Sequence, residues 1–171
     1  MDRHSAVYRL VMVAVMTAVL EAAKFALNAI PNVELISLLL MVFTTHFGWK
    51  DTMNSALLFA VIESIWWGIS IWTITYFYVW PLLVLICSRL DDSVSVLFRS
   101  FVLGLFGLLF GLLCTFPTLL TAGLSATVAW WIAGIPFDLI HGVSNFVLCL
   151  LLYRPLVHAL ARIRKARASE D

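Results

Sequence analysis

Several polar residues that could do chemistry lie inside long apolar stretches. Near the C-terminus, Asp138, His141 and Asn145 recur at i, i+3 and i+7, a spacing that places them on one face of a helix. An ionisable side chain within hydrocarbon costs a few kcal/mol, so this face is expected to point inward. Such a face either binds a ligand or holds the helices of the protein together.

Three more ionisable residues interrupt the apolar stretches. Glu21 and Lys24 are three residues apart and are expected to form an ion pair, while Glu63 lies one helical turn before Trp66 and Trp67. No spacing of His, Cys, Asp or Glu is typical of a metal site, so the sequence predicts no metal centre.

Aromatic residues surround one of the expected connections between helices. They are Trp66, Trp67, Trp72, Tyr76, Tyr78 and Trp80, and two further tryptophans, Trp130 and Trp131, begin the last apolar stretch. Tryptophan and tyrosine belts are common at membrane interfaces. Here, however, every tryptophan except Trp49 is expected on the outer side. Flat rings above a polar inner face suit a planar, polar organic ligand.

The composition shows which classes of protein can carry these side chains. Of the 171 residues, 63% are hydrophobic and 12% are charged, with a net charge of +1, whereas a soluble domain is about 25% charged. These values exclude a soluble enzyme and give no basic field for nucleic acid. The cysteines match neither a disulfide framework nor a zinc pattern. The sequence therefore predicts an all-α integral protein of the plasma membrane.

Charge and Pro/Gly punctuation divide the chain into six expected spans. They lie at about 6–29, 34–46, 52–70, 72–88, 95–115 and 128–153, and a basic tail follows at 154–171. If both termini are cytoplasmic, the inner side holds every Lys and Arg except Lys24, which lies within the first span. We therefore expect one multi-pass domain with six transmembrane helices and both termini in the cytoplasm.

Small residues form two rows at helical spacing. The first predicted span carries Ala14, Ala18, Ala22 and Ala26 at every fourth position, and the fifth carries Gly104, Gly107 and Gly111. Small side chains let another helix approach closely in a membrane. For the alanine row, the partner is either a helix of the same chain or a separate subunit. For the glycine row, packing within the chain is predicted.

Taken together, these features resemble one family of membrane transport subunits. The size, the six expected spans and the alanine row are similar to the substrate-binding S-components of energy-coupling-factor (ECF) transporters. So are the segments IPNVEL at 30–35, YVWP at 78–81 and PFDLIHG at 136–142. The likeness covers about residues 6–155 and is greatest to the cobalamin-specific S-components of lactobacilli.

The resemblance implies a function in transport rather than catalysis. An S-component binds a vitamin outside the cell and associates with a transmembrane scaffold subunit and two cytoplasmic ATPases. It then topples in the membrane to release the substrate inside. The resemblance implies that Ala14, Ala18 and Ala22 dock on the scaffold, and that cobalamin is the transported substrate. No catalytic residue and no cofactor are expected.

The expected substrate site combines the polar and aromatic residues of the outer side. It comprises Asn32, Glu34, Trp66, Trp67, Tyr76, Tyr78, Trp80, Trp131, Asp138 and His141. Within the family, another vitamin or a queuosine-type precursor is the alternative substrate. Two alternatives come from other classes: a small membrane enzyme that uses Asp138 and His141 as acid and base, and an assembly factor that binds no ligand.

Overall fold

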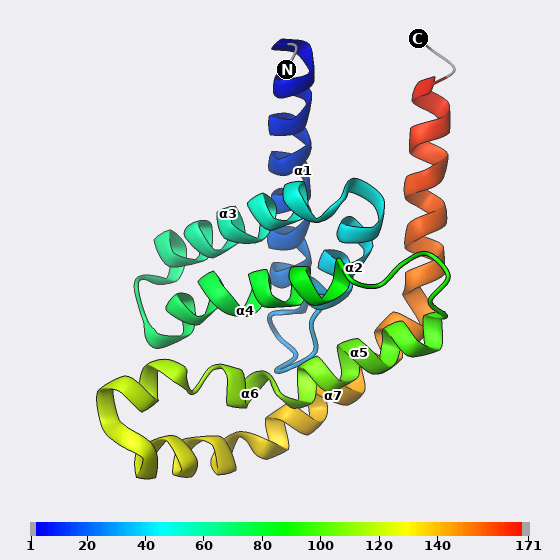
Figure 1. The fold of residues 1–171 in the computed structure, drawn as a ribbon. Helices are drawn as coiled ribbons and strands as arrows, with labels where there is room; N and C mark the ends of the chain where they lie inside the picture. The colour runs from blue at the N-terminus through cyan, green and yellow to red at the C-terminus, as the bar shows by residue number, and fades with distance from the viewer. Residues whose placement is uncertain (1–2, 169–171) are drawn as a thin grey trace.

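The computed structural model describes the backbone of residues 3–168 and the side chains of residues 6–163, and this part of the chain folds into helices with no strand. The helices are α1 (Arg3–Leu27), α2 (Ile36–Phe47), α3 (Trp49–Trp67), α4 (Ile71–Cys87), α5 (Val96–Leu108), α6 (Phe110–Leu113) and α7 (Phe116–Ala168) (Figure 1). The predicted all-helical fold is confirmed.

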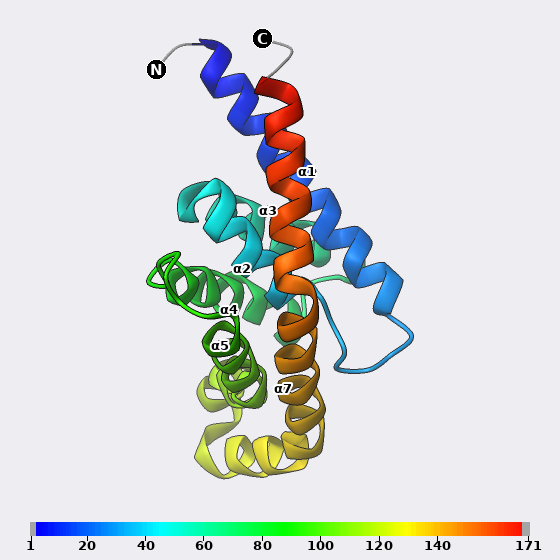
Figure 2. The same ribbon diagram turned by 90° about the vertical axis from the view of Figure 1, so that its right-hand side faces the viewer.

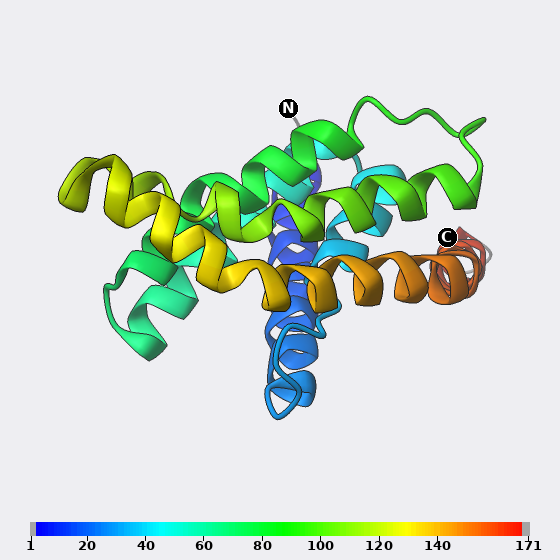
Figure 3. The ribbon, with the colours of Figure 1, turned by 90° about the horizontal axis from the view of Figure 1, so that it is seen from below.

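Helix α2 lies at the centre of the molecule, among helices that pack beside one another. Helices α3 and α4 run beside each other and join at a short turn, while α5 and α6 lie along the first part of α7 (Figures 1 and 3). Helix α2 contacts α1, α3, α4 and α7, and its residues 36–44 are all buried. This placement explains why α2 is apolar on every side.

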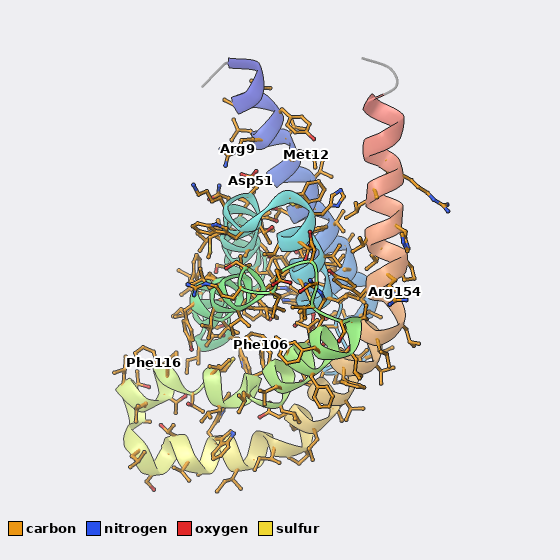
Figure 4. The ribbon with its side chains drawn as sticks, turned by 45° about the vertical axis from the view of Figure 1, so that its right-hand side comes forward. Arg9, Met12, Asp51, Phe106, Phe116 and Arg154 are labelled. Carbon is orange, nitrogen blue, oxygen red and sulfur yellow. The ribbon has the colours of Figure 1, made fainter. Side chains whose placement is uncertain are left out.

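The first part of α1 and the last part of α7 extend beyond this body in the same direction (Figures 1 and 2). Helix α7 bends before its final segment, and Arg154 lies at that bend, next to Pro155 (Figure 4). A proline inside a helix removes a hydrogen bond and bends the helix axis. The two ends of the described chain therefore lie on the same side of the body.

Several helices differ in extent from the predicted spans. The fifth predicted span, 95–115, is divided at Leu109 into α5 and α6. The last helix begins before residue 128, and the segment predicted as a tail is helical as far as Ala168, with 169–171 outside the described residues. Arginine, lysine, leucine and alanine favour helix, so nothing after residue 153 ends it. Within α7 only Gly123 departs from helical geometry, with φ 79°.

The lengths of the helices and their apolar composition show which of them could cross a membrane. Two stretches, Ala6–Leu27 and Phe116–Ile163, are long and apolar enough to cross a bilayer. Helices α2, α4 and α5 are apolar but contain only 12, 17 and 13 residues, compared with about 20 for a typical span. Large apolar side chains are exposed on every helix longer than one turn, except α2. The helices are therefore compatible with a membrane location, and the six spans remain a prediction.

Helices α5 and α7 approach closely because glycines face the contact. A Cβ atom on Gly107 would lie 2.9 Å from the Cα atom of Gly142, and one on Gly111 would lie 2.4 Å from Asp138 Oδ2. A Cβ atom on Gly104 would lie 3.2 Å from that of Phe146. The prediction that the glycine row packs within the chain is confirmed.

Replacing Gly107 with alanine tests this contact. The new methyl group would meet the backbone of α7, so we expect Gly107→Ala to lower the free energy of unfolding by about 1–3 kcal/mol. Gly134→Ala is the matched control, because a Cβ atom there meets nothing within 4 Å. Equilibrium unfolding in mixed micelles measures both variants. Equal stability of the two would contradict the close contact.

Candidate functional site

The connection between α1 and α2 ends at Glu34, whose carboxylate joins two parts of the molecule. One oxygen accepts a hydrogen bond of 2.9 Å from the backbone N–H of Ser37 in the first turn of α2, where the helix dipole favours negative charge. The other lies 3.2 Å from His141 Nε2 on α7. Glu34 therefore holds the first turn of α2 and also links the connection to α7.

Two further hydrogen bonds join the same segments. The Ser144 hydroxyl donates to the backbone oxygen of Asn32 over 3.1 Å, and Asn145 Nδ2 donates to Ser37 Oγ over 3.2 Å. Asn32 has φ 59°, a left-handed conformation that asparagine tolerates better than most residues. One face of α7 therefore holds the connection and the start of α2 in place.

Asp138 lies one turn before His141 and has a different partner. Its Oδ1 atom accepts a hydrogen bond of 2.9 Å from the backbone N–H of Gly111, at the start of α6. Its Oδ2 atom is buried and has no hydrogen-bond partner in the described part of the chain. Asp138, His141 and Asn145 are all buried, so the predicted inward orientation of this face is confirmed.

A series of aromatic rings extends from this polar face toward α3. The Phe110 ring lies 4.7 Å from the His141 ring, and Trp80 lies 5.4 Å from Phe110. Tyr76 lies 5.6 Å from Trp80 and stacks on Phe59 at 6.0 Å, all distances being between ring centroids. The Trp80 indole N–H is buried without a hydrogen-bond acceptor among the described residues. The interior between α7 and α3 is therefore mostly aromatic, with a few polar groups such as His141 and the Trp80 N–H among the rings.

A charged group lies at the other end of these rings. Lys24 of α1 pairs with Glu63 of α3, whose side chain is 1% exposed, and its Nζ atom lies 3.3 Å from the Tyr76 hydroxyl. The expectation that Lys24 would pair with Glu21 is therefore wrong. Both carboxylate oxygens of Glu21 are buried, with no hydrogen-bond partner in the described structure. Tyr76 contacts both Lys24 and Trp80, so it connects the charged group to the aromatic rings.

The structure brings together only part of the predicted substrate site. We call Glu34, Tyr76, Trp80, Asp138 and His141 the inner cluster, and Asn32 borders it through its backbone oxygen. No hydrogen bond or ring contact in the described part of the chain joins the other predicted residues to it: Trp66, Trp67, Tyr78 and Trp131. The first two are 66% and 54% exposed, and the Tyr78 hydroxyl donates to the backbone oxygen of Leu113 over 2.9 Å. Whether these ten residues bind a substrate remains a prediction.

The sequence analysis missed Lys24, Phe59 and Phe110 as neighbours of the inner cluster. For Lys24 a signal was present, because a lysine within an apolar helix needs a counter-charge. The two phenylalanines are members of a set of twelve, and nothing in their spacing distinguished them. In the described part of the chain, no group of three or more His, Cys, Asp or Glu side chains could hold a metal ion.

Comparisons of the chain with known protein families, with curated proteins and with solved structures find no match. The geometry of the site and the sequence pattern therefore carry the functional argument.

Removing the counter-charge of Lys24 tests the charged group. Glu63→Leu leaves the lysine without its partner, so we expect the free energy of unfolding to fall by about 3 kcal/mol. The double variant Lys24→Met, Glu63→Leu replaces the pair with apolar side chains of similar size and should recover most of that loss. Equilibrium unfolding in mixed micelles gives both values. A double variant no more stable than Glu63→Leu alone would show that the pair does not act as a unit.

Proposed function

We propose that the chain is the substrate-binding S-component of an ECF-type importer and that it binds cobalamin. The observation that carries the proposal is the inner cluster. Three segments far apart in the chain bring polar groups and aromatic rings together there, in an otherwise apolar molecule. Convergent polar groups beside aromatic rings are the usual composition of a site for a small organic ligand.

The chemistry of cobalamin fits these groups. Its flat corrin offers a broad surface to exposed aromatic rings such as Trp66 and Trp67, and its fringe of amides offers N–H donors and carbonyl acceptors. Asp138 Oδ2 is an acceptor without a protein partner, and the Trp80 indole N–H is a donor without one. The Trp72 and Trp130 rings lie 5.3 Å apart, so the α3–α4 turn is close to the first part of α7. Exposed rings in this region can contact parts of the ligand outside the inner cluster.

Calorimetry on the purified protein tests the substrate. Titration with cobalamin should show saturable binding at micromolar concentrations, and Trp80→Ala should weaken binding by about 1–3 kcal/mol through lost apolar burial. Trp49→Ala is the matched control, because Trp49 is exposed at the far end of α3. Saturable binding of another vitamin or a queuosine-type precursor, with none of cobalamin, would change the substrate and keep the family.

For the membrane, we propose six spans with both termini in the cytoplasm. The support is the placement of positive charge, because Lys50, Arg89, Arg99 and Arg154 all lie at or near the helix ends opposite the α3–α4 turn (Figure 1). Asp92, in the α4–α5 connection, and Ser125, just after the Gly123 break near the start of α7, are both exposed, and these two segments lie at opposite ends of the horizontal helices (Figure 1).

Cysteine labelling tests the orientation. An impermeant thiol reagent applied to whole cells should label Ser125→Cys and leave Asp92→Cys unlabelled until the cells are opened. The natural cysteines are buried, so the unmodified protein is the background control. The opposite labelling pattern would reverse the orientation.

We propose that Ala14, Ala18 and Ala22 form the surface that docks on the transmembrane scaffold subunit, which works with two cytoplasmic ATPases. The three alanines are exposed on α1, on the side away from the buried Met16 and Leu20. This exposure favours a partner outside the chain over packing against another of its helices.

A bulky side chain in the alanine row tests docking. Ala18→Trp should abolish association with the scaffold and leave ligand binding unchanged, because the ring would hold two helices apart where close packing supplies the association energy. Ala18→Ser should retain association. Leu97→Trp, at an exposed position of α5, controls for a bulky side chain elsewhere on the surface. Co-purification and calorimetry give the two readouts. Normal association of Ala18→Trp would remove the alanine row from the interface.

The alternative of a membrane enzyme would need Asp138 and His141 to act on one substrate atom. In the structure, the first bonds to Gly111 and the second to Glu34, so no observation favours this reading over a binding protein. Recovery of chemically unchanged ligand after binding separates the two functions.

A further inference from the structure

The last segment of α7 changes direction next to Pro155. In Figure 3 the part after the bend is seen along its axis, whereas α5 and the first part of α7 lie across the view. The bend lies beside the α4–α5 connection, because Arg154 and Val157 line the same cavity as Asp92 of that connection. The terminal segment, residues 154–168, therefore begins at the helix ends proposed to be cytoplasmic and runs across the direction of α5.

The terminal segment has a basic side and an apolar side. Arg154, His158 and Arg162 recur at every fourth position and are all exposed, so they share one face of the helix. Three residues of the other side are half-buried and pack against the core of the molecule: Leu156, Val157 and Leu160. The segment is therefore amphipathic, and its basic side points away from the protein.

The sequence adds to the positive charge of the terminal segment. Arg164, Lys165 and Arg167 follow, with side chains outside the described residues, and no acidic residue lies between Asp138 and Glu170. Positive charge on the cytoplasmic side requires only basic residues there. Here the basic residues belong to a helix that also has an apolar side, which is typical of helices that lie on a membrane surface.

We propose that the terminal segment lies along the cytoplasmic surface of the membrane and that its basic side binds the headgroups of anionic phospholipids. The segment extends beyond the body of the molecule (Figures 1 and 2), so it lies over the surrounding lipid. Long arginine side chains reach from such a helix to the phosphate groups. The proposal rests on the proposed membrane orientation and is independent of the transported substrate.

A spin label on the full chain tests the proposal. Ala159→Cys, exposed on the terminal segment, carries the label, because the natural cysteines are buried. The protein is placed in vesicles of dioleoyl phosphatidylcholine, with and without dioleoyl phosphatidylglycerol. Collisions with oxygen and with a water-soluble nickel chelate then give the ratio of membrane-bound to water-exposed label. Phosphatidylglycerol should raise this ratio, and high salt should reverse the rise, because ions screen the attraction.

Two arginines provide the charge test. Arg162→Gln should lower the ratio in phosphatidylglycerol vesicles about fivefold, as expected for the loss of one basic residue near an anionic surface. Arg162 is chosen because Arg154 shares its cavity with Asp92. Arg89→Gln is the matched control, because Arg89 is an exposed arginine in the α4–α5 connection at the same end of the molecule, and it should leave the ratio unchanged.

Three results would overturn the proposal. Two of them are equal ratios in the two kinds of vesicle and an equal loss in Arg89→Gln. The third is a label that stays water-exposed in phosphatidylglycerol vesicles but is shielded by added polyglutamate, which would identify an acidic protein as the partner.

A second labelled position separates this proposal from the membrane location on which it rests. Val143→Cys, at an exposed position of the proposed sixth span, should carry a lipid-exposed label in both kinds of vesicle. A water-exposed label there would remove the span itself, whereas a lipid-exposed one leaves the result at position 159 to decide the proposal. Failure of cobalamin binding would change neither readout.

Discussion

The arrangement of α1, α3 and α7 depends on one constraint: a charge placed in an apolar interior needs a partner there. Lys24 of α1 and Glu63 of α3 form such a pair in the interior. A second ion pair between the same helices, Arg9 with Asp51, lies at a more exposed position (Figure 4). Between them the Thr17 and Ser55 hydroxyls lie 3.1 Å apart. Apolar packing has no direction, whereas these contacts fix how far along α3 the first helix lies.

The same constraint links the fold to the candidate site. Asp138 can bond to the start of α6 only because residue 111 is glycine, since a Cβ atom there would collide with its carboxylate. The glycines of α5 and α6 that face α7 therefore also determine where the polar face of α7 meets the aromatic rings. The helix contact and the hydrogen bond therefore depend on the same residue, and a side chain larger than glycine at position 111 would disturb both.

Periodicity within a segment was a good guide to the helices and to the buried face of α7, because spacing reports which residues share a side of one element. It could not reveal partners on different elements. Glu21 and Lys24 have suitable spacing for an ion pair, yet Lys24 forms its ion pair with Glu63 on α3. Likewise, the aromatic residues grouped by the sequence divide into buried Trp80 and exposed Trp66, since burial depends on how the helices pack.

The hydrogen bonding of the interior indicates which ligands it can select. Glu34 uses both oxygens on protein donors, and Asp138 uses one. What remains without a partner is Asp138 Oδ2, both oxygens of Glu21 and the N–H of Trp80, so free acceptors outnumber free donors. A ligand that brings N–H groups satisfies these acceptors, whereas one that brings only carbonyl or phosphate oxygens leaves them unpaired and repels them. In the function proposed above, the amide fringe of the corrin would supply such donors.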